Sequence, residues 1–147
     1  MSETSVVEGV SVDDRVLIRD LYDRFYWALN TGGEGLMDCF APGAQIERGG
    51  VGDTIGPETS LESAEKWAQD PVGVTYQHHV SNMIVDPDPD GREDHRSVRI
   101  YFMVTGVENP PEIKVRWSCR AFDDVQLVDG RWTFFRRRIQ LNHQGTA

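Results

Sequence analysis

Two adjacent histidines, His78 and His79, are the residues of this chain whose type and spacing best suit chemistry. They fall within Thr75 to Val85, a stretch with the composition of a β-strand. Because side chains alternate across a strand, one imidazole should face inward and the other outward. A histidine in an apolar shell can accept a proton near neutral pH without a cofactor. The competing interpretation is one surface histidine and one hydrogen-bonded core histidine.

An arginine on the apolar face of the last predicted strand, Arg131 to Leu141, is a second candidate. Alternation puts Phe135 and Arg137 on that face, and it puts Arg136 and Arg138 on the other. A buried guanidinium without a partner is very costly, so Arg137 must meet a carboxylate, a carbonyl group or a ligand. A structural ion pair with one of the 24 acidic residues and a ligand role both satisfy this requirement.

Aromatic residues and an amide could complete a site around these two groups. Tyr22, Tyr26 and Asn30 are spaced i, i+4 and i+8, so they line up on one predicted helix. The residues that we expect to form the wall of a pocket are Tyr22, Trp27, Tyr101, Trp117 and Phe135.

Metal and cofactor sites are not predicted. Cys39 and Cys119 are far apart and have no CxxC spacing, and the side chains of His78 and His79 diverge. Asp86 to Gly91 begins like a calcium loop, but Ser97 stands where the bidentate Glu is needed, so a hairpin connection is preferred over calcium. The chain also has no glycine-rich phosphate loop and no nucleophile elbow.

The composition limits the class of protein. The chain has 147 residues with 15 Lys and Arg against 24 Asp and Glu, a net charge of −9, which argues against binding to nucleic acid or to an anionic membrane. It contains no apolar run long enough for a membrane span and no signal peptide, which predicts a cytoplasmic protein. We expect a flexible N-terminal arm, 1–10, and one domain, 11–147.

The order of the predicted elements indicates an α+β domain, with helices first and a curved antiparallel sheet after them. Three helices are expected, from Ser11 to Gly32, Glu34 to Phe40 and Glu58 to Gln69. Between the last two, a hairpin at Gly49-Gly50 should join strands Ala44 to Arg48 and Val51 to Ile55. The long strands are Thr75 to Val85, His95 to Val107, Ile113 to Val128 and Arg131 to Leu141.

An ordered set of short motifs resembles the SnoaL-like branch of the nuclear transport factor 2 superfamily. The motifs are Ile18-Arg19-Asp20-Leu21-Tyr22, Ala28-Leu29-Asn30-Thr31-Gly32, Cys39-Phe40-Ala41-Pro42, His78-His79-Val80-Ser81-Asn82 and Asp129-Gly130-Arg131-Trp132. The resemblance implies a cone-shaped domain in which a strongly curved sheet wraps around helices and leaves a deep apolar pocket. It also implies a homo-oligomer, either a dimer or a trimer.

Within this superfamily, the arrangement is similar to that of scytalone dehydratase and hexachlorocyclohexane dehydrochlorinase. These enzymes abstract a proton with a His on the third strand, which an Asp at the end of the first helix orients, and they need no metal. The resemblance places His78 at the position of the base and Asn30 at the position of the Asp, and Arg137 matches an arginine of the final strand. An amide can orient an imidazole, but it cannot stabilise an imidazolium by charge.

The function expected from these residues is cofactor-independent proton abstraction from a small apolar organic molecule, leading to elimination, isomerisation or cyclisation. His78 would be the base, Asn30 its orienting partner, and Arg137 and Tyr26 the groups that stabilise the developing enolate or leaving group. A non-catalytic alternative is a ligand-binding or accessory subunit similar to ring-hydroxylating dioxygenase β subunits. A third, epoxide hydrolysis, needs two inward-facing acids that the sequence does not place.

Overall fold

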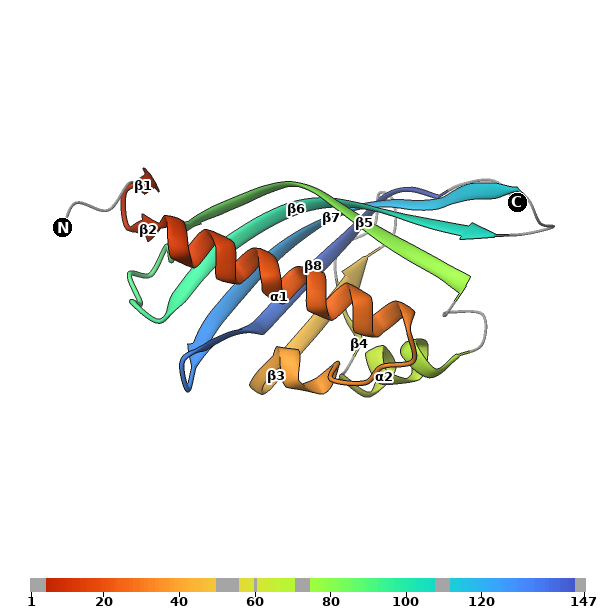
Figure 1. Cartoon of the computed structure of the whole chain (residues 1–147), viewed down its shortest axis with the longest axis horizontal. Coiled ribbons are helices and arrows are strands. Elements are labelled where there is room, and N and C mark those ends of the chain that lie inside the picture. Colours follow the sequence, from red (N-terminus) through yellow and green to blue (C-terminus); the bar gives the residue numbers. More distant parts are fainter. Residues whose placement is uncertain (1–4, 50–55, 60, 71–74, 108–111, 145–147) are drawn as a thin grey trace.

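A six-stranded sheet curves around one long helix (Figure 1). The computed structural model describes residues 5–49, 56–59, 61–70, 75–107 and 112–144. Its elements in order are β1 (Ser5–Val7), β2 (Val10–Ser11), α1 (Val12–Asn30), a 3-10 turn η1 (Met37–Cys39), β3 (Phe40–Gly49), β4 (Gly56–Thr59), α2 (Leu61–Gln69), β5 (Tyr76–Pro87), β6 (His95–Val107), β7 (Ile113–Val128) and β8 (Arg131–Gln144).

The predicted α+β class with a curved sheet is confirmed. The strand order is β4-β3-β8-β7-β6-β5, and β5 to β8 form a continuous antiparallel meander. One pair differs from the expected antiparallel arrangement, because β3 runs parallel to β8. No hairpin joins these two strands, so no turn forces them to be antiparallel.

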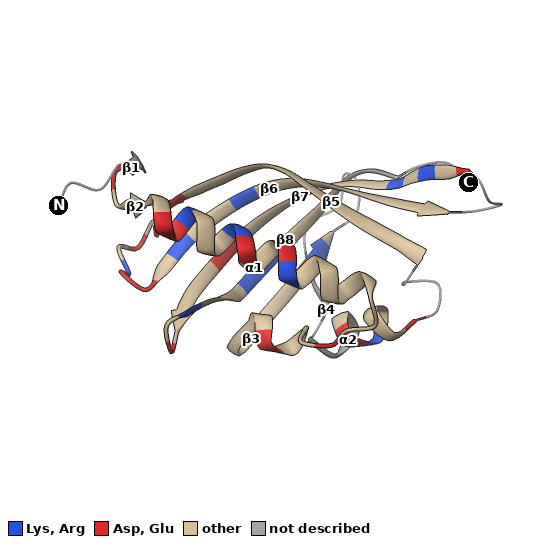
Figure 2. Cartoon of the chain, viewed as in Figure 1, with Lys and Arg blue, Asp and Glu red and all other residues tan. Residues whose placement is uncertain are grey.

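Helix α1 begins where the sequence predicts and packs one face on the sheet. The Ser11 hydroxyl caps it by accepting a hydrogen bond from the Asp14 amide at 3.0 Å. The opposite face carries two i,i+4 ion pairs, Arg19 with Asp23 and Arg24 with Asp20. Figure 2 shows residues of both charges along this helix. The helix thus separates a polar outer face from a buried inner face.

Between α1 and β5, the predicted elements need correction. The helix expected over Glu34 to Phe40 is only the single turn η1, because Gly35 adopts a left-handed φ of +77° that an α-helix cannot contain. The helix expected from Glu58 begins at Leu61, because residues 56–59 pair with β3 as a strand. The expected strand Val51 to Ile55 lies outside the described residues.

Part of the N-terminal segment, 1–10, which the sequence predicts as a flexible arm, has regular structure. Strands β1 and β2 pair as a short antiparallel hairpin that leads directly into α1. The side chain of Val10 is buried in the core. Residues 1–4 lie outside the described part.

A bulge in β5 changes which side chains face inward. Before the bulge, His78 and Val80 face the interior, and after it Met83 and Val85 do. The pairing with β6 shifts between Ser81 and Ile84, and Asn82 adopts a left-handed φ of +54°. Strict alternation would have put Ile84 inside, but the bulge leaves it exposed.

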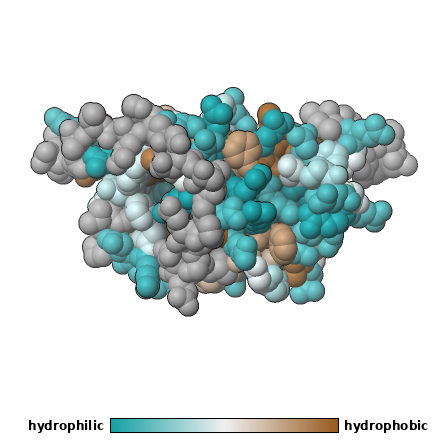
Figure 3. All heavy atoms as spheres, turned by 180° about the vertical axis from the view of Figure 1, so that it is seen from behind, coloured by the Kyte–Doolittle hydropathy of each residue, from teal (hydrophilic) through white to brown (hydrophobic). Residues whose placement is uncertain are grey.

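The core lies between α1 and the concave face of the sheet, and the outer face of the sheet is mixed in polarity. Tyr101 and Met103 alternate with buried neighbours and are exposed, and Val115 is also exposed. Seen from behind, hydrophilic residues cover most of the described surface, with hydrophobic groups between them (Figure 3). Neither described helix is long and apolar enough to cross a membrane.

Candidate functional site

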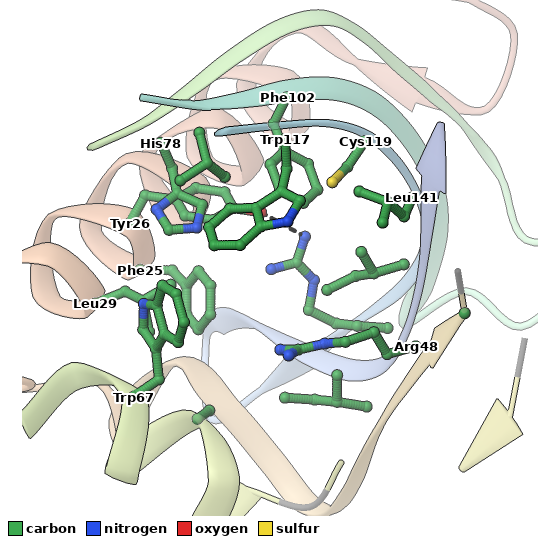
Figure 4. A pocket seen from close by; sticks show the side chains of 16 residues that line it. Phe25, Tyr26, Leu29, Arg48, Trp67, His78, Phe102, Trp117, Cys119 and Leu141 are labelled. Atoms are coloured by element: carbon green, nitrogen blue, oxygen red, sulfur yellow. Dashed lines mark hydrogen bonds between the residues drawn. The ribbon is translucent and has the colours of Figure 1, made fainter. Parts of the chain in front are cut away.

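A cavity of about 330 Å³ opens at the end of the sheet where α2 lies, and it is largely apolar with a few polar groups (Figure 4). Helices α1 and α2 and strands β3 and β5 to β8 all contribute to its wall. The lining residues are Phe25, Tyr26, Leu29, Ile46, Arg48, Gly49, Ala64, Trp67, His78, Phe102, Val104, Trp117, Cys119, Arg137, Ile139 and Leu141. Its size and lining are those of a pocket for a small organic molecule.

Three successive turns of α1 present one polar group each to the sheet. Tyr22 donates to Asp123 on β7, Tyr26 accepts from Arg137 on β8, and Asn30 bonds His78 on β5. The i, i+4, i+8 spacing of the sequence therefore forms a row of contacts that runs from the closed core to the cavity.

The imidazole of His78 is held by its two neighbours on α1. Its Nδ1 lies 2.9 Å from Asn30 Oδ1, and its ring stacks on Tyr26 with centroids 4.9 Å apart. With the amide oxygen as acceptor, Nδ1–H donates and Nε2 keeps its lone pair. The ring edge turned away from α1 points to the cavity (Figure 4).

The surroundings of His78 keep it neutral. Burial and the positive charge of Arg137, with smaller effects of His79 and Arg48, lower the pKa of His78 to about 3. The ring is therefore an unprotonated base at neutral pH, and no carboxylate of the described residues contacts it to stabilise the protonated form. His79, on the opposite face of β5, is exposed and bonds Thr105.

Arg137 is fully buried and forms an ion pair with Asp123. The Nε and Nη2 atoms of Arg137 donate to the two carboxylate oxygens of Asp123 at 3.1 and 3.0 Å, and Nη2 also donates to the Tyr26 hydroxyl at 3.0 Å. Burial is the largest single effect and lowers the pKa of Arg137, but the charge and hydrogen bond of Asp123 together with Tyr26 and Tyr22 raise this pKa above its ordinary value. Within the described residues, its Nη1 forms no hydrogen bond, which leaves donors for a ligand oxygen.

The Tyr26 hydroxyl is neutral and close to both candidate groups. Burial raises the pKa of Tyr26 to about 12, although Arg137 counteracts this effect. Because its oxygen accepts from Arg137, its own proton is available to an oxygen in the cavity. The structure thus brings together the four predicted catalytic residues, His78, Asn30, Arg137 and Tyr26. The predicted wall residue Trp117 lines the cavity.

Four of the predicted wall residues are elsewhere. Trp27 is 75% exposed because it lies one position past Tyr26, on the outer face of α1, and Tyr101 is exposed because it alternates with buried Ile100 and Phe102. Tyr22 is buried but packs in the closed core against Phe134, away from the cavity lining.

Phe135 is the fourth, and a bulge explains its position. The pairing of β7 with β8 shifts between Asp124 and Val125, so Phe134 and Arg137 both face inward. Phe135 instead packs edge-on against His95. Strict alternation through this strand therefore fails at the bulge.

Sequence reasoning missed Asp123, Arg48 and Trp67 as parts of the site. Asp123 continues the alternation of Trp117, Cys119 and Ala121 on β7, so extending that pattern by one step would have identified the partner of Arg137. Trp67 falls within the predicted helix from Glu58 to Gln69, but it is not among the predicted wall residues. Arg48 shares the apolar side of the predicted strand Ala44 to Arg48 with Ala44 and Ile46, so the alternation that singled out Arg137 could also have indicated Arg48.

Neither metal ligation nor a thiol nucleophile is supported by the described residues. In that part of the chain, no group of three or more His, Cys, Asp or Glu side chains could hold a metal ion. Burial raises the pKa of Cys119, which lines the cavity, to about 11, so its sulfur is an unreactive thiol. Asp88, from the loop that resembles a calcium site, pairs with Arg92.

The fold and the enclosed pocket define a class of small domains built around a curved sheet, and a family model places the chain within it. The SnoaL-like domain model matches residues 10–138, so the chain belongs to the SnoaL-like family. The expected resemblance is confirmed. Among curated proteins, no sequence matches this chain.

Solved structures share the fold at low sequence identity. A candidate scytalone dehydratase from Novosphingobium aromaticivorans is 19% identical with a TM-score of 0.65, covering 92% of this chain and 91% of its own. ActVI-ORFA from Streptomyces coelicolor is 15% identical with a TM-score of 0.68, and the match covers 88% of this chain and 97% of that protein. The beta subunit of a candidate aromatic-ring-hydroxylating dioxygenase from N. aromaticivorans is 12% identical with a TM-score of 0.69. The match covers 90% of this chain and 91% of that subunit.

Proposed function

We propose that this protein is a cofactor-independent enzyme that abstracts a proton from a small organic molecule bound in the cavity. The observation that carries the proposal is the neutral His78, held by Asn30 with its free ring edge toward a largely apolar cavity. Membership of the SnoaL-like family, and structural likeness to a candidate scytalone dehydratase, support a dehydratase, isomerase or cyclase type of reaction.

The proposed reaction begins with a carbon acid next to a carbonyl group. His78 Nε2 takes the proton from the carbon, and the electron pair moves to the carbonyl oxygen to form an enolate. The Tyr26 hydroxyl and Arg137 Nη1 are the donors for that oxygen, and Asp123 holds the guanidinium in place. The proton on His78 then returns to another carbon, or to a leaving hydroxyl group, which gives isomerisation or dehydration.

A direct test is hydrogen exchange, because proton abstraction exchanges an acidic C–H for deuterium even where no later step follows. A panel of enolisable aryl ketones and β-hydroxy ketones is incubated in D₂O with the wild type, His78→Gln and, as a control, His79→Gln. We expect catalysed exchange with the wild type and with His79→Gln and at least a hundredfold loss with His78→Gln. Full exchange with His78→Gln would refute the mechanism.

A non-catalytic role is the second candidate, and two observations favour it. Asn30 offers no negative charge to a protonated His78, and the pKa of His78 is far below neutral. The likeness to a dioxygenase beta subunit gives this role a specific form, an accessory subunit. Light scattering of the purified protein separates the two: a stable homodimer or homotrimer supports the enzyme, whereas a chain that is stable only with a larger partner supports the subunit.

A further inference from the structure

We propose that Arg48 is an anion-binding group at the mouth of the cavity, and that the natural ligand is an aromatic molecule with an acidic substituent, such as a carboxylate. This inference rests on the proposed function only in taking the cavity as the ligand site. It adds a substrate class that the apolar lining alone does not suggest.

The position of Arg48 directs its charge toward the ligand. It lies on β3 next to Ile139 of β8, and two residues before it Ile46 faces the same side and also lines the cavity. In Figure 4 the guanidinium of Arg48 extends from β3 into the cavity, across from His78. The backbone of Arg48 is therefore part of the sheet, whereas its exposed side chain belongs to the entrance.

No acidic side chain of the described residues forms an ion pair with Arg48. By contrast, Arg137 is neutralised by Asp123 and Arg136 is paired with Glu47. None of the described residues that line the cavity is an Asp or Glu. A cavity with uncompensated positive charge and apolar walls attracts an anion.

The charge of Arg48 also acts on His78. After burial, Arg137 and His79, Arg48 is a smaller cause that lowers the pKa of His78. An anion on Arg48 would cancel part of that effect. A ligand with an acidic group would therefore strengthen the base at the moment of binding.

The aromatic part of the proposed ligand follows from the rings near the entrance. Trp67 stacks on Tyr76 with centroids 5.5 Å apart, and Trp117 lies edge-on to both at 6.0 and 5.4 Å. Trp67 and Trp117 line the cavity. Flat aromatic walls in the same cavity as the Arg48 guanidinium fit a flat aromatic acid.

The test compares two ligands of nearly equal shape, 2-naphthoate and 2-naphthamide, which differ in charge. Calorimetric titration of the full chain at low salt should show that the wild type binds the acid about tenfold more tightly than the amide. Arg48→Gln should abolish this preference, and higher ionic strength should weaken it in the wild type. The control Arg138→Gln, which removes the same charge from an exposed position outside the cavity, should keep the preference.

Three outcomes would overturn the inference: equal affinity of the wild type for both ligands, a preference that survives in Arg48→Gln, or no binding of either ligand. His78→Gln separates this inference from the proposed function. Suppose that His78→Gln still prefers 2-naphthoate and that the wild type catalyses no deuterium exchange. This result would support the anion site and refute the proposed enzymatic function. Thermal unfolding of each variant checks that it is folded.

Discussion

Asn30 Oδ1 lies 2.9 Å from His78 Nδ1, so a neutral amide holds the imidazole that faces the cavity. The contact fixes the orientation of the ring and the location of its proton. It contributes no charge to the protonated state. Substitution of Asn30 can therefore separate two effects on His78, the orientation of its ring and the stabilisation of its protonated form by charge.

Asn30→Asp should raise the pKa of His78, because a carboxylate next to Nδ1 favours the imidazolium by about 1 to 3 pH units. If the protein abstracts protons, the exchange rate in D₂O should rise with it. NMR titration of the His78 ring measures the pKa. Asn82→Asp, which adds the same charge at an exposed position of β5, is the control and should change the pKa much less. An unchanged pKa in Asn30→Asp would show that the contact does not persist in solution.

The depressed pKa of His78 predicts how stability depends on pH. In the unfolded chain this residue binds a proton below about pH 6.5, whereas in the folded protein it does so only below about 3. Stability should therefore fall as the pH drops from 6.5 toward 3, by roughly 1 to 2 kcal/mol between pH 6.5 and 5.

Urea unfolding of the wild type and His78→Gln across this pH range isolates the contribution of His78. The variant should lose that part of the slope, and His79→Gln should retain it because His79 is exposed. Parallel curves for the wild type and His78→Gln would mean that water or a ligand solvates the ring in the folded protein.

Asp123→Asn should destabilise the protein by about 3 to 5 kcal/mol, because it leaves the fully buried Arg137 without a counter-charge. The double variant Asp123→Leu with Arg137→Met should be more stable than Asp123→Asn, since it buries no charge. Asp23→Asn, which breaks an exposed pair on α1, should change stability by less than about 1 kcal/mol. Chemical denaturation measures all three, and a small loss in Asp123→Asn would mean that the ion pair is not closed in solution.

Two tryptophans on helices provide a matched test of the cavity. Trp67 lines it, whereas Trp27 is 75% exposed. Trp67→Ala should weaken binding of 2-naphthoate about tenfold by removing an aromatic wall. Trp27→Ala should leave the affinity unchanged, and a loss of binding in this variant would mean that the ligand site is not the cavity.

Much of the architecture could be predicted because long runs of alternating side chains determine strands well. The bounds of β6 and β7 agree with the prediction, and the Asp129-Gly130 turn between β7 and β8 has two positive φ values, +50° and +77°, as a tight Asp-Gly hairpin turn requires. Helix α1 followed from its serine cap and its apolar face. These signals come from neighbouring residues, so they do not depend on contacts between distant parts of the chain.

The rest of the site depends on contacts that are remote in sequence. Phe135 was misplaced because a bulge, which has no clear residue signature, shifts alternation within β8. Trp27 and Tyr101 are aromatic, but the periods of helix α1 and strand β6 turn both side chains outward, so the prediction that they line the pocket was wrong. Arg48 reaches the cavity only because β3 pairs with the distant strand β8, a parallel pairing that no turn encodes.

The bulge at Asn82 divides β5 into two segments with different tasks. The first segment, with His78, faces the ligand cavity, and the second, with Val85, faces the closed core. Because the bulge adds one residue, the alternation that points inward in the first segment points outward in the second. One strand can thus present both His78 and Val85 to the interior, although unbroken alternation would place these two side chains on opposite faces of the sheet.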